Sequence, residues 1–103
     1  MTDASRGHLL AKARELPDRP GVYLFLGPAK ESLYIGKARS LRDRIRNYFG
    51  NPAGLPPKIR RMMEEAVDLG FVLTDSEIEA LLLENNLLKK EQPRYNTLLR
   101  DDK

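Results

Sequence analysis

Glu84 is the residue whose position in the sequence most directly suggests chemistry. At about 100° per residue of a helix, it shares a face with Ala80, Leu81, Leu87 and Leu88. Burying an unpaired carboxylate costs several kcal/mol, so Glu84 must find a cation, a metal ion or a proton. Two interpretations follow: a structural ion pair with an arginine, or a metal site.

Two tyrosines, Tyr23 and Tyr34, lie in apolar segments that have the composition of β-strands. Side chains alternate along a strand, so each phenol faces away from its apolar neighbour, and strand pairing could bring both phenols onto one face. A phenol with a pKa of ~10 is a poor base at neutral pH, but nearby cations or a metal-bound water make its ionised form less costly. The alternative is that both tyrosines simply pack in a core.

A cluster of positive charge follows the second tyrosine. Residues 1–50 hold ten Lys and Arg against five Asp and Glu, a net charge of +5, whereas residues 51–103 carry a net −2. Such a patch favours a polyanion, usually nucleic acid, although it could also be a solvated helix face. Lys37 and Arg44 are candidates to act beside the phenols. The expected DNA-binding residues are Lys37, Arg39, Arg42, Arg44 and Arg46.

Together these residues supply the parts needed for phosphodiester hydrolysis. A carboxylate can hold a divalent ion, a phenol can act as a base, and a cation can offset charge on the phosphate. The sequence does not contain the residues that two other kinds of site require. The segment "GKARS" does not fit a phosphate-binding P-loop, and His8, the only histidine, has no Ser-His-Asp set around it. Without cysteine, the chain forms no disulfide and uses no thiolate.

The elements that must position these residues are short, and proline and glycine separate them. Ser40 is the expected N-cap of the arginine-bearing helix, and Ser76 with Glu79 forms a capping box on the helix of Glu84. We expect helices at 6–15, 41–49, from about 57 to near 70, and 76–90; strands at 22–26, 33–36 and 71–74; and an extended tail from 94.

The length of 103 residues suits one domain, and no apolar run approaches the ~18 residues of a membrane span. The first residues also lack the pattern of a secretory signal, so we expect a cytoplasmic protein that makes no membrane contact.

The sequence resembles the GIY-YIG nuclease family, and the resemblance covers nearly the whole chain. It rests on "GVY", ten residues, "YIG", the helix "LRDRIRNYF", and the long block "TDSEIEALLLENNLLKKEQPRYNTLLRDDK". Within the family, these segments are most similar to the nuclease of nucleotide excision repair. The resemblance implies an α+β fold with a small three-stranded antiparallel sheet flanked by helices, and a Mg²⁺- or Mn²⁺-dependent DNA cut on the 3′ side of a lesion. It also implies damaged double-stranded DNA and the repair protein UvrB as partners.

The resemblance also implies roles for individual residues. Tyr34 matches the proposed general base, Tyr23 a tyrosine that assists it, and Glu84 the single metal ligand. Arg44 matches the arginine that contacts the scissile phosphate. The remaining matches to residues at or beside the site are Gly36, Lys37, Tyr48 and Asn96.

Several alternatives remain open at this stage. Tyr23 and Tyr34 could exchange roles. The domain could belong to a stand-alone repair endonuclease, bind DNA without cutting it, or dock a protein. Residues 1–103 are expected to be a single domain, an N-terminal fragment of a longer protein, because the UvrB-interacting segment, second nuclease domain and helix-hairpin-helix module of the repair nuclease are missing from them.

Overall fold

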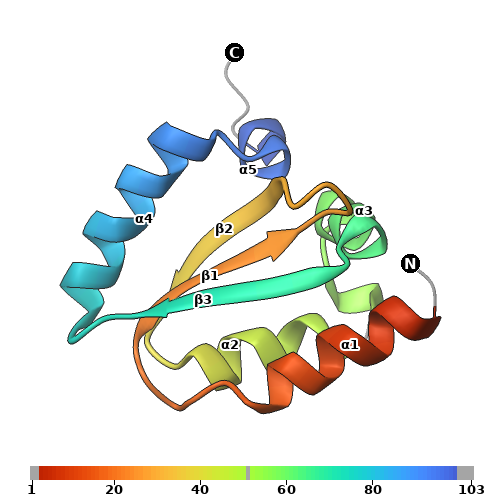
Figure 1. Cartoon of the computed structure of the whole chain (residues 1–103), viewed down its shortest axis with the longest axis horizontal. Helices are drawn as coiled ribbons and strands as arrows, with labels where there is room; N and C mark the ends of the chain where they lie inside the picture. Colours follow the sequence, from red (N-terminus) through yellow and green to blue (C-terminus); the bar gives the residue numbers. More distant parts are fainter. Residues whose placement is uncertain (1–2, 51, 100–103) are drawn as a thin grey trace.

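A three-stranded antiparallel sheet with strand order β2-β1-β3 organises the fold, as expected (Figure 1). The computed structural model describes residues 3–50 and 52–99. The strands are β1 Gly21–Leu26, β2 Ser32–Ala38 and β3 Asp68–Leu73. The helices are α1 Asp3–Arg14, α2 Leu41–Tyr48, α3 Pro57–Glu65, α4 Glu77–Glu91 and α5 Arg94–Leu99, with a 3₁₀ turn at Pro52–Gly54.

The β1–β2 hairpin sets the positions of the two tyrosines. Tyr23 pairs with Gly36, and Phe25 pairs with Tyr34. Because side chains two residues apart on a strand share a face, Tyr23 and Tyr34 lie on the same face, as the sequence suggested.

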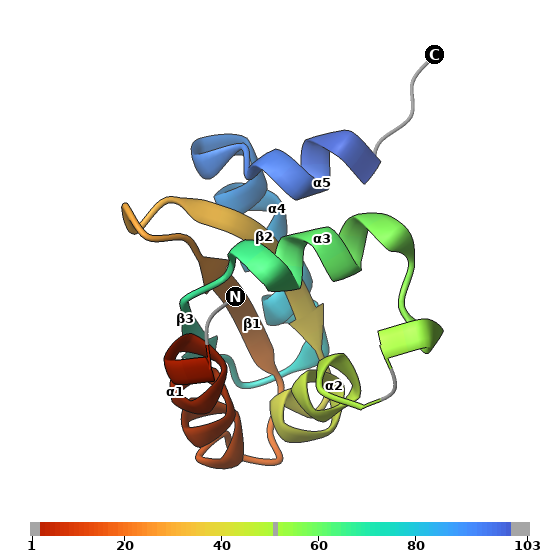
Figure 2. The ribbon, with the colours of Figure 1, turned by 90° about the vertical axis from the view of Figure 1, so that its right-hand side faces the viewer.

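Helices cover both faces of the sheet (Figures 1 and 2). The face that carries Tyr23 and Phe25 contributes to the main core, which includes Leu9 of α1, Ile45 of α2 and Met62 of α3. On the opposite face, Val22 and Ile35 pack with Ala80 of α4. The sheet therefore lies between α4 on one side and α1, α2 and α3 on the other.

The expected helix caps form. Ser40 Oγ accepts a hydrogen bond from the Asp43 backbone N–H at 3.2 Å, and Ser76 Oγ accepts one from the Glu79 N–H at 3.2 Å. The capping box differs in one bond, since Glu79 Oε1 accepts from the N–H of Asp75 at 2.7 Å. Both caps satisfy N–H groups that have no partner within the helix.

Two predicted elements were wrong. The helix after the prolines ends at Glu65, and Gly70 lies within β3 opposite Leu24. The tail is the helix α5 as far as Leu99, because Tyr95 is fully buried in the core and anchors this turn of chain. Residues 100–103 of the predicted extended tail lie outside the described residues.

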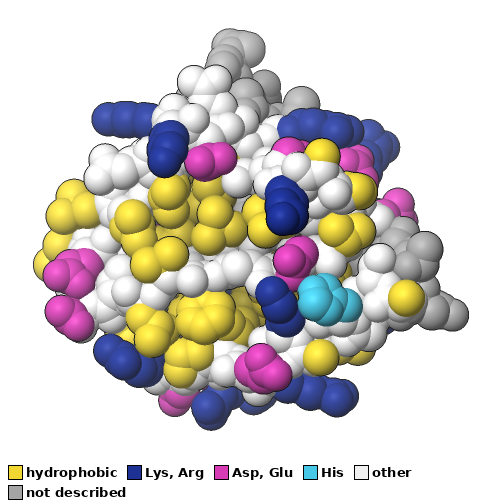
Figure 3. Space-filling model, in the orientation of Figure 1, with side chains coloured by type: hydrophobic (Ala, Val, Ile, Leu, Met, Phe, Trp, Pro, Cys, Tyr) yellow, Lys and Arg dark blue, Asp and Glu magenta, His cyan; other side chains and the backbone are white. Residues whose placement is uncertain are grey.

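Apolar side chains gather on the surface over β3 and α4 (Figure 3). Leu81 of α4 is 42% exposed, so the α4 face that packs on the sheet is narrower than the helical pattern suggested. The large exposed hydrophobic residues are Phe71, Val72, Leu73, Ile78, Leu81 and Leu82. Within residues 3–50 and 52–99, no helix has the length and apolar character needed to cross a membrane.

Candidate active site

Three tyrosines from three elements form the centre of the candidate site. The hydroxyl oxygens of Tyr23 on β1 and Tyr48 on α2 lie 2.6 Å apart, within hydrogen-bonding distance. The ring centroids of Tyr23 and Tyr34 are 6.4 Å apart. Tyr23 is 2% exposed, whereas Tyr34 and Tyr48 are partly exposed. Of the two tyrosines in the repeated motif, Tyr34 is therefore the one that solvent reaches.

The glycine of "YIG" is required by the packing of Tyr23. A Cβ atom on Gly36 would collide with the hydroxyl and ring of Tyr23, which lies directly against the strand at that point. The glycine of "GVY" is confined in the same way, because a Cβ on Gly21 would collide with the Val72 carbonyl and with Leu41. Both motif glycines allow a close approach of neighbouring groups.

Burial raises the pKa of all three phenols further above neutral pH. Desolvation raises the pKa of Tyr23 to about 12, although its hydrogen bond with Tyr48 opposes the shift. Desolvation also raises the pKa of Tyr34 and that of Tyr48 above the usual phenol value. The positive charge of Arg44 lowers all three pKa values. Arg44 thus acts electrostatically on the whole tyrosine cluster.

Glu84 lies among the apolar residues of α4 that pack on the sheet, as its position on the helix suggested, but it is partly exposed. Desolvation raises its pKa, while the charge of Lys37, the Lys37 backbone N–H and the charge of Arg44 lower it. Its own charge raises the pKa of Tyr23 and Tyr34, so the carboxylate belongs to the same electrostatic cluster as the phenols. Within the described part of the chain, Glu84 forms no ion pair with an arginine.

These residues fit a hydrated divalent ion better than a metal cage made only of protein ligands. The described residues contain no group of three or more His, Cys, Asp or Glu side chains that could hold a metal ion together. Mg²⁺ usually keeps several waters and is bound through one or two carboxylates. The partly desolvated Glu84, with solvent access and phenols nearby, matches that manner of binding.

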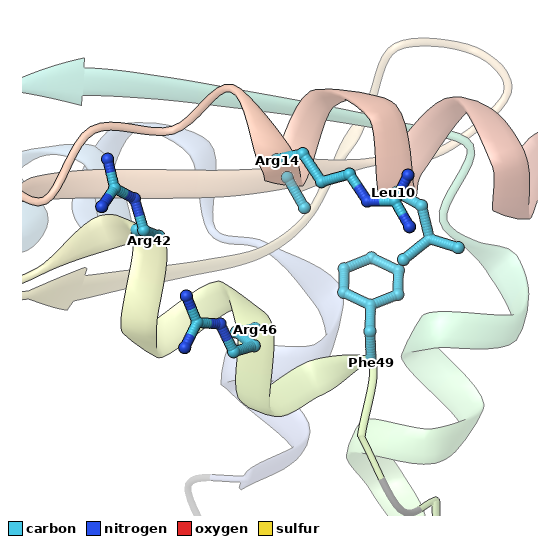
Figure 4. A pocket seen from close by; sticks show the side chains of 6 residues that line it. Leu10, Arg14, Arg42, Arg46 and Phe49 are labelled. Carbon is cyan, nitrogen blue, oxygen red and sulfur yellow. The ribbon is translucent and has the colours of Figure 1, made fainter.

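The predicted DNA-binding residues lie on different surfaces. Lys37 and Arg44 act on Glu84, as described above. Arg39 forms an ion pair with Glu77 at the start of α4, with Nε and Oε2 2.9 Å apart. Arg42 and Arg46 rise from α2 toward α1 (Figure 4). The five basic residues therefore do not form one continuous surface.

Asn96 supports the site through the backbone. Its Oδ1 accepts a hydrogen bond from the Ile35 N–H at 2.8 Å, and its Nδ2 donates to the Ile35 carbonyl at 2.9 Å. The amide thus pairs with β2 between Tyr34 and Gly36, in the manner of a neighbouring strand. Sequence reasoning placed Asn96 at the site but missed this contact, since only the fold brings α5 to the edge of β2.

A network on α3 and α5 was not anticipated from the sequence. The Tyr95 hydroxyl donates a hydrogen bond to Glu65 Oε2, and Arg94 Nη2 lies 3.1 Å from the same oxygen. These contacts hold α5 against α3, and α5 in turn carries Asn96.

A sequence profile for the UvrC-like GIY-YIG domain matches residues 19–97. The UvrABC system protein C of Carboxydothermus hydrogenoformans is 52% identical over 95 residues, which cover 92% of this chain and 16% of that protein. The same protein of Cytophaga hutchinsonii is 53% identical over 90 residues, covering 87% of this chain and 15% of that protein. The chain thus spans about a sixth of the length of these relatives.

Among solved structures, the chain is similar to the GIY-YIG N-terminal endonuclease domain of UvrC from Thermotoga maritima bound to magnesium, its catalytic divalent cation. The TM-score is 0.77 and the identity 37%, over 92% of this chain and 98% of that one. Variants of that domain with a tyrosine replaced by phenylalanine, or an asparagine by alanine, have also been solved with the divalent cation bound.

Proposed function

Because the chain belongs to the UvrC-like GIY-YIG domain family, an endonuclease family, we propose that it makes the 3′ incision beside a lesion in nucleotide excision repair. The substrate is damaged double-stranded DNA, and UvrB is the partner, contacted through regions outside these residues. In this proposal the protein works in the cytoplasm.

The observation that supports the chemistry most directly is the electrostatic coupling of Glu84, Tyr34 and Arg44, which come from α4, β2 and α2. A carboxylate, a phenol that solvent reaches and a guanidinium influence one another there. A site that binds DNA without cutting it has no need of a desolvated carboxylate, which repels phosphate.

In the proposed reaction, Glu84 holds the divalent ion. When bound, Mg²⁺ or Mn²⁺ neutralises charge on the phosphate and makes water more acidic. Tyr34, the accessible tyrosine of the motif, acts in its ionised form: the phenolate oxygen receives the proton of the attacking water and becomes a neutral phenol. Tyr48 fixes Tyr23 through the 2.6 Å hydrogen bond, and the ring of Tyr23 packs beside Tyr34.

The cations act on the phosphate. Arg44 donates hydrogen bonds to the non-bridging oxygens and offsets the charge that develops during attack. Lys37 adds a second positive charge at the edge of β2 and favours the ionised form of Glu84. Both charges oppose the desolvation that raises the pKa of Glu84, and the charge of Arg44 also opposes the desolvation that raises the pKa of the phenols.

Replacing Glu84 by Gln tests the proposal. We expect 3′ incision to fall by more than about 100-fold, since the metal-binding charge is lost. DNA affinity in EDTA should remain or rise, because a negative charge is removed. The measurement is incision of an end-labelled lesion duplex by the full-length protein that carries this domain, with its UvrABC partners.

Glu64→Gln is the matched control, an exposed carboxylate on α3, and should leave incision unchanged. If Glu84→Gln retains incision, the assignment of Glu84 is wrong. If the wild-type protein binds DNA but cuts none when Mg²⁺ or Mn²⁺ is added, the non-catalytic DNA-binding alternative is correct.

A further inference from the structure

A cavity lies between α1 and α2 (Figure 4), and none of the three tyrosines of the candidate site lines it. It has a volume of about 260 Å³ and combines apolar walls with guanidinium groups. Its lining residues are Leu10, Ala13, Arg14, Arg42, Arg46 and Phe49. The proposed reaction uses none of them.

The charge of this cavity is unbalanced. No carboxylate lines it. Across the residues that the structure describes, neither Arg14 nor Arg46 forms an ion pair. Arg42 Nε donates to the Leu16 carbonyl at 3.3 Å, a bond that leaves its positive charge uncompensated. Figure 4 shows the guanidinium group of Arg14 beside Phe49, while those of Arg42 and Arg46 lie further along the hollow. These like charges repel one another, and negative charge bound along the hollow would relieve that repulsion.

The apolar part of the cavity restricts the kind of anion. Phe49 and Leu10 are partly exposed, and both face the hollow with the arginines around them. The guanidinium carbon of Arg6 lies 5.8 Å from the centroid of the Phe49 ring, so a fourth arginine adjoins the ring. The complementary ligand carries negative charge next to a flat or apolar body.

A nucleotide has this combination of groups. Its phosphate suits the guanidinium groups, and its base can stack on an aromatic ring or on the plane of a guanidinium. In a paired duplex the bases are stacked inside the helix and cannot reach such a wall. The cavity therefore fits an unpaired nucleotide better than duplex DNA.

The position of the cavity also separates it from the cleaved phosphodiester. Arg42 and Arg46 each lie two residues from Arg44, about 200° away around the helix. Arg44 acts on the tyrosines and Glu84 from one side of α2, while the cavity opens on the other side. A phosphate at Arg44 and a nucleotide in the cavity would thus occupy opposite sides of one short helix.

We propose that the α1–α2 cavity binds an unpaired nucleotide of single-stranded DNA, with the phosphates on either side of it held by Arg14, Arg42 and Arg46 and its base placed against Phe49. This inference rests on the proposed function, because it takes the polyanion to be DNA. It adds a single-strand contact distinct from the catalytic site.

The test measures binding by fluorescence anisotropy, with the 103-residue chain in EDTA and labelled oligo-dT or a duplex of equal length. Replacing both Arg14 and Arg46 by Gln should weaken oligo-dT binding about tenfold or more. It should also reduce the steepness with which the logarithm of the binding constant falls with the logarithm of salt concentration, by about one to two, since up to two phosphate contacts are lost. Phe49→Leu should weaken oligo-dT binding at least about fivefold and leave duplex binding nearly unchanged.

Arg60→Gln is the matched control, an exposed arginine on α3 away from the cavity, and should have little effect. Arg14 and Arg46 are exposed, so replacing them should not weaken folding. The double variant therefore tests the site even if Phe49→Leu lowers the stability of the fold. Unchanged oligo-dT affinity in the double variant would overturn the proposal. Equal losses for oligo-dT and duplex would also overturn it, as would displacement of oligo-dT from the cavity by a Glu-rich peptide but not by dTMP.

These results are separable from the proposed function. Binding in EDTA does not require the metal site, so Glu84→Gln should retain the oligo-dT affinity. If Glu84→Gln retains incision, the proposed function fails alone. If the Arg14 and Arg46 double variant keeps its oligo-dT affinity, the proposal for the cavity fails alone.

Discussion

Tyr34 and Tyr23 are equivalent in the sequence but differ in the fold. Tyr23 is buried and its hydroxyl is engaged with Tyr48, whereas Tyr34 remains partly exposed. A group that takes a proton from water must be reached by water. The structure therefore favours Tyr34 as the base and Tyr23 as a positioning residue, an order that spacing alone left open.

The first prediction is a pH profile. Desolvation raises the pKa of Tyr34, so the phenol is almost wholly protonated at pH 7, and the active phenolate fraction grows about tenfold per pH unit below that pKa. We expect the single-turnover incision rate to rise through pH 7–9. Tyr34→Phe should lower the incision rate by more than about 100-fold, and the remaining rate should no longer rise with pH.

Tyr95→Phe provides the control, since it removes a phenol that bonds to Glu65 away from the cluster. That variant should keep the wild-type slope. A Tyr34→Phe protein with the same pH dependence would show that another group is the base.

At the scale of elements, α5 completes the edge of β2. The Asn96 amide satisfies both the N–H and the carbonyl of Ile35. Asn96→Ala removes both bonds and should lower the free energy of unfolding by about 1–3 kcal/mol. It should also lower kcat, with a smaller change in KM, because the backbone between Tyr34 and Gly36 loses its support while DNA contacts remain.

Denaturant unfolding and steady-state incision measure the two effects. Asn47→Ala, at an exposed position on α2, should change neither. A rise in KM alone would contradict a positioning role for Asn96.

A second element-scale prediction concerns the contact between α1 and β3. Asp68 accepts hydrogen bonds from Lys12, from His8 and from the Leu69 N–H. Desolvation raises its pKa, but these bonds outweigh that effect and lower it to about 2 from 3.8. Because the folded pKa is depressed, the stabilisation is present above pH 3.8 and is lost as the pH falls toward 2.

Asp68→Asn should therefore lower the free energy of unfolding by about 1 kcal/mol at pH 6, a value discounted for the exposure of the carboxylate. The difference from wild type should shrink in urea titrations between pH 4 and pH 2. If the difference in unfolding free energy between wild type and Asp68→Asn stayed constant from pH 4 to pH 2, the ionised Asp68 carboxylate would not be the source of the stabilisation.

Elements with local signals were predictable from the sequence, and elements held by distant contacts were not. Ser40 and Ser76 cap their helices through bonds within four residues, so the sequence around them contains the information. The six residues of α5 are too short for a stable isolated helix, and α5 depends on burial of Tyr95. Gly70 suggested a helix end, yet pairing with β1 makes it a strand residue.

The same distinction applies to the candidate site. The helical face predicted Glu84, the motif predicted Tyr23 and Tyr34, and the family resemblance predicted Arg44 and Tyr48. The bonds from Asn96 to Ile35, and the cavity that Arg14 and Arg46 both line, depend on the packing of separate elements. No spacing in the sequence encodes those contacts.

For the whole molecule, the candidate site exists only when the chain is folded. Tyr23, Tyr34, Tyr48 and Glu84 come from β1, β2, α2 and α4, so the unfolded chain cannot bring them together. A ligand that binds only the folded state stabilises it in proportion to the logarithm of its concentration. Metal binding should therefore be measurable as thermal stability, without any DNA.

We expect Mg²⁺ or Mn²⁺ at about ten times its dissociation constant to add about 1.4 kcal/mol to the free energy of unfolding. In a domain of 103 residues this raises Tm by roughly 5–10 °C. EDTA should reverse the rise, and Glu84→Gln should abolish it, whereas Glu64→Gln should retain it. Calorimetry at constant ionic strength separates specific binding from salt screening, and an equal rise in the Glu84→Gln protein would place the metal elsewhere.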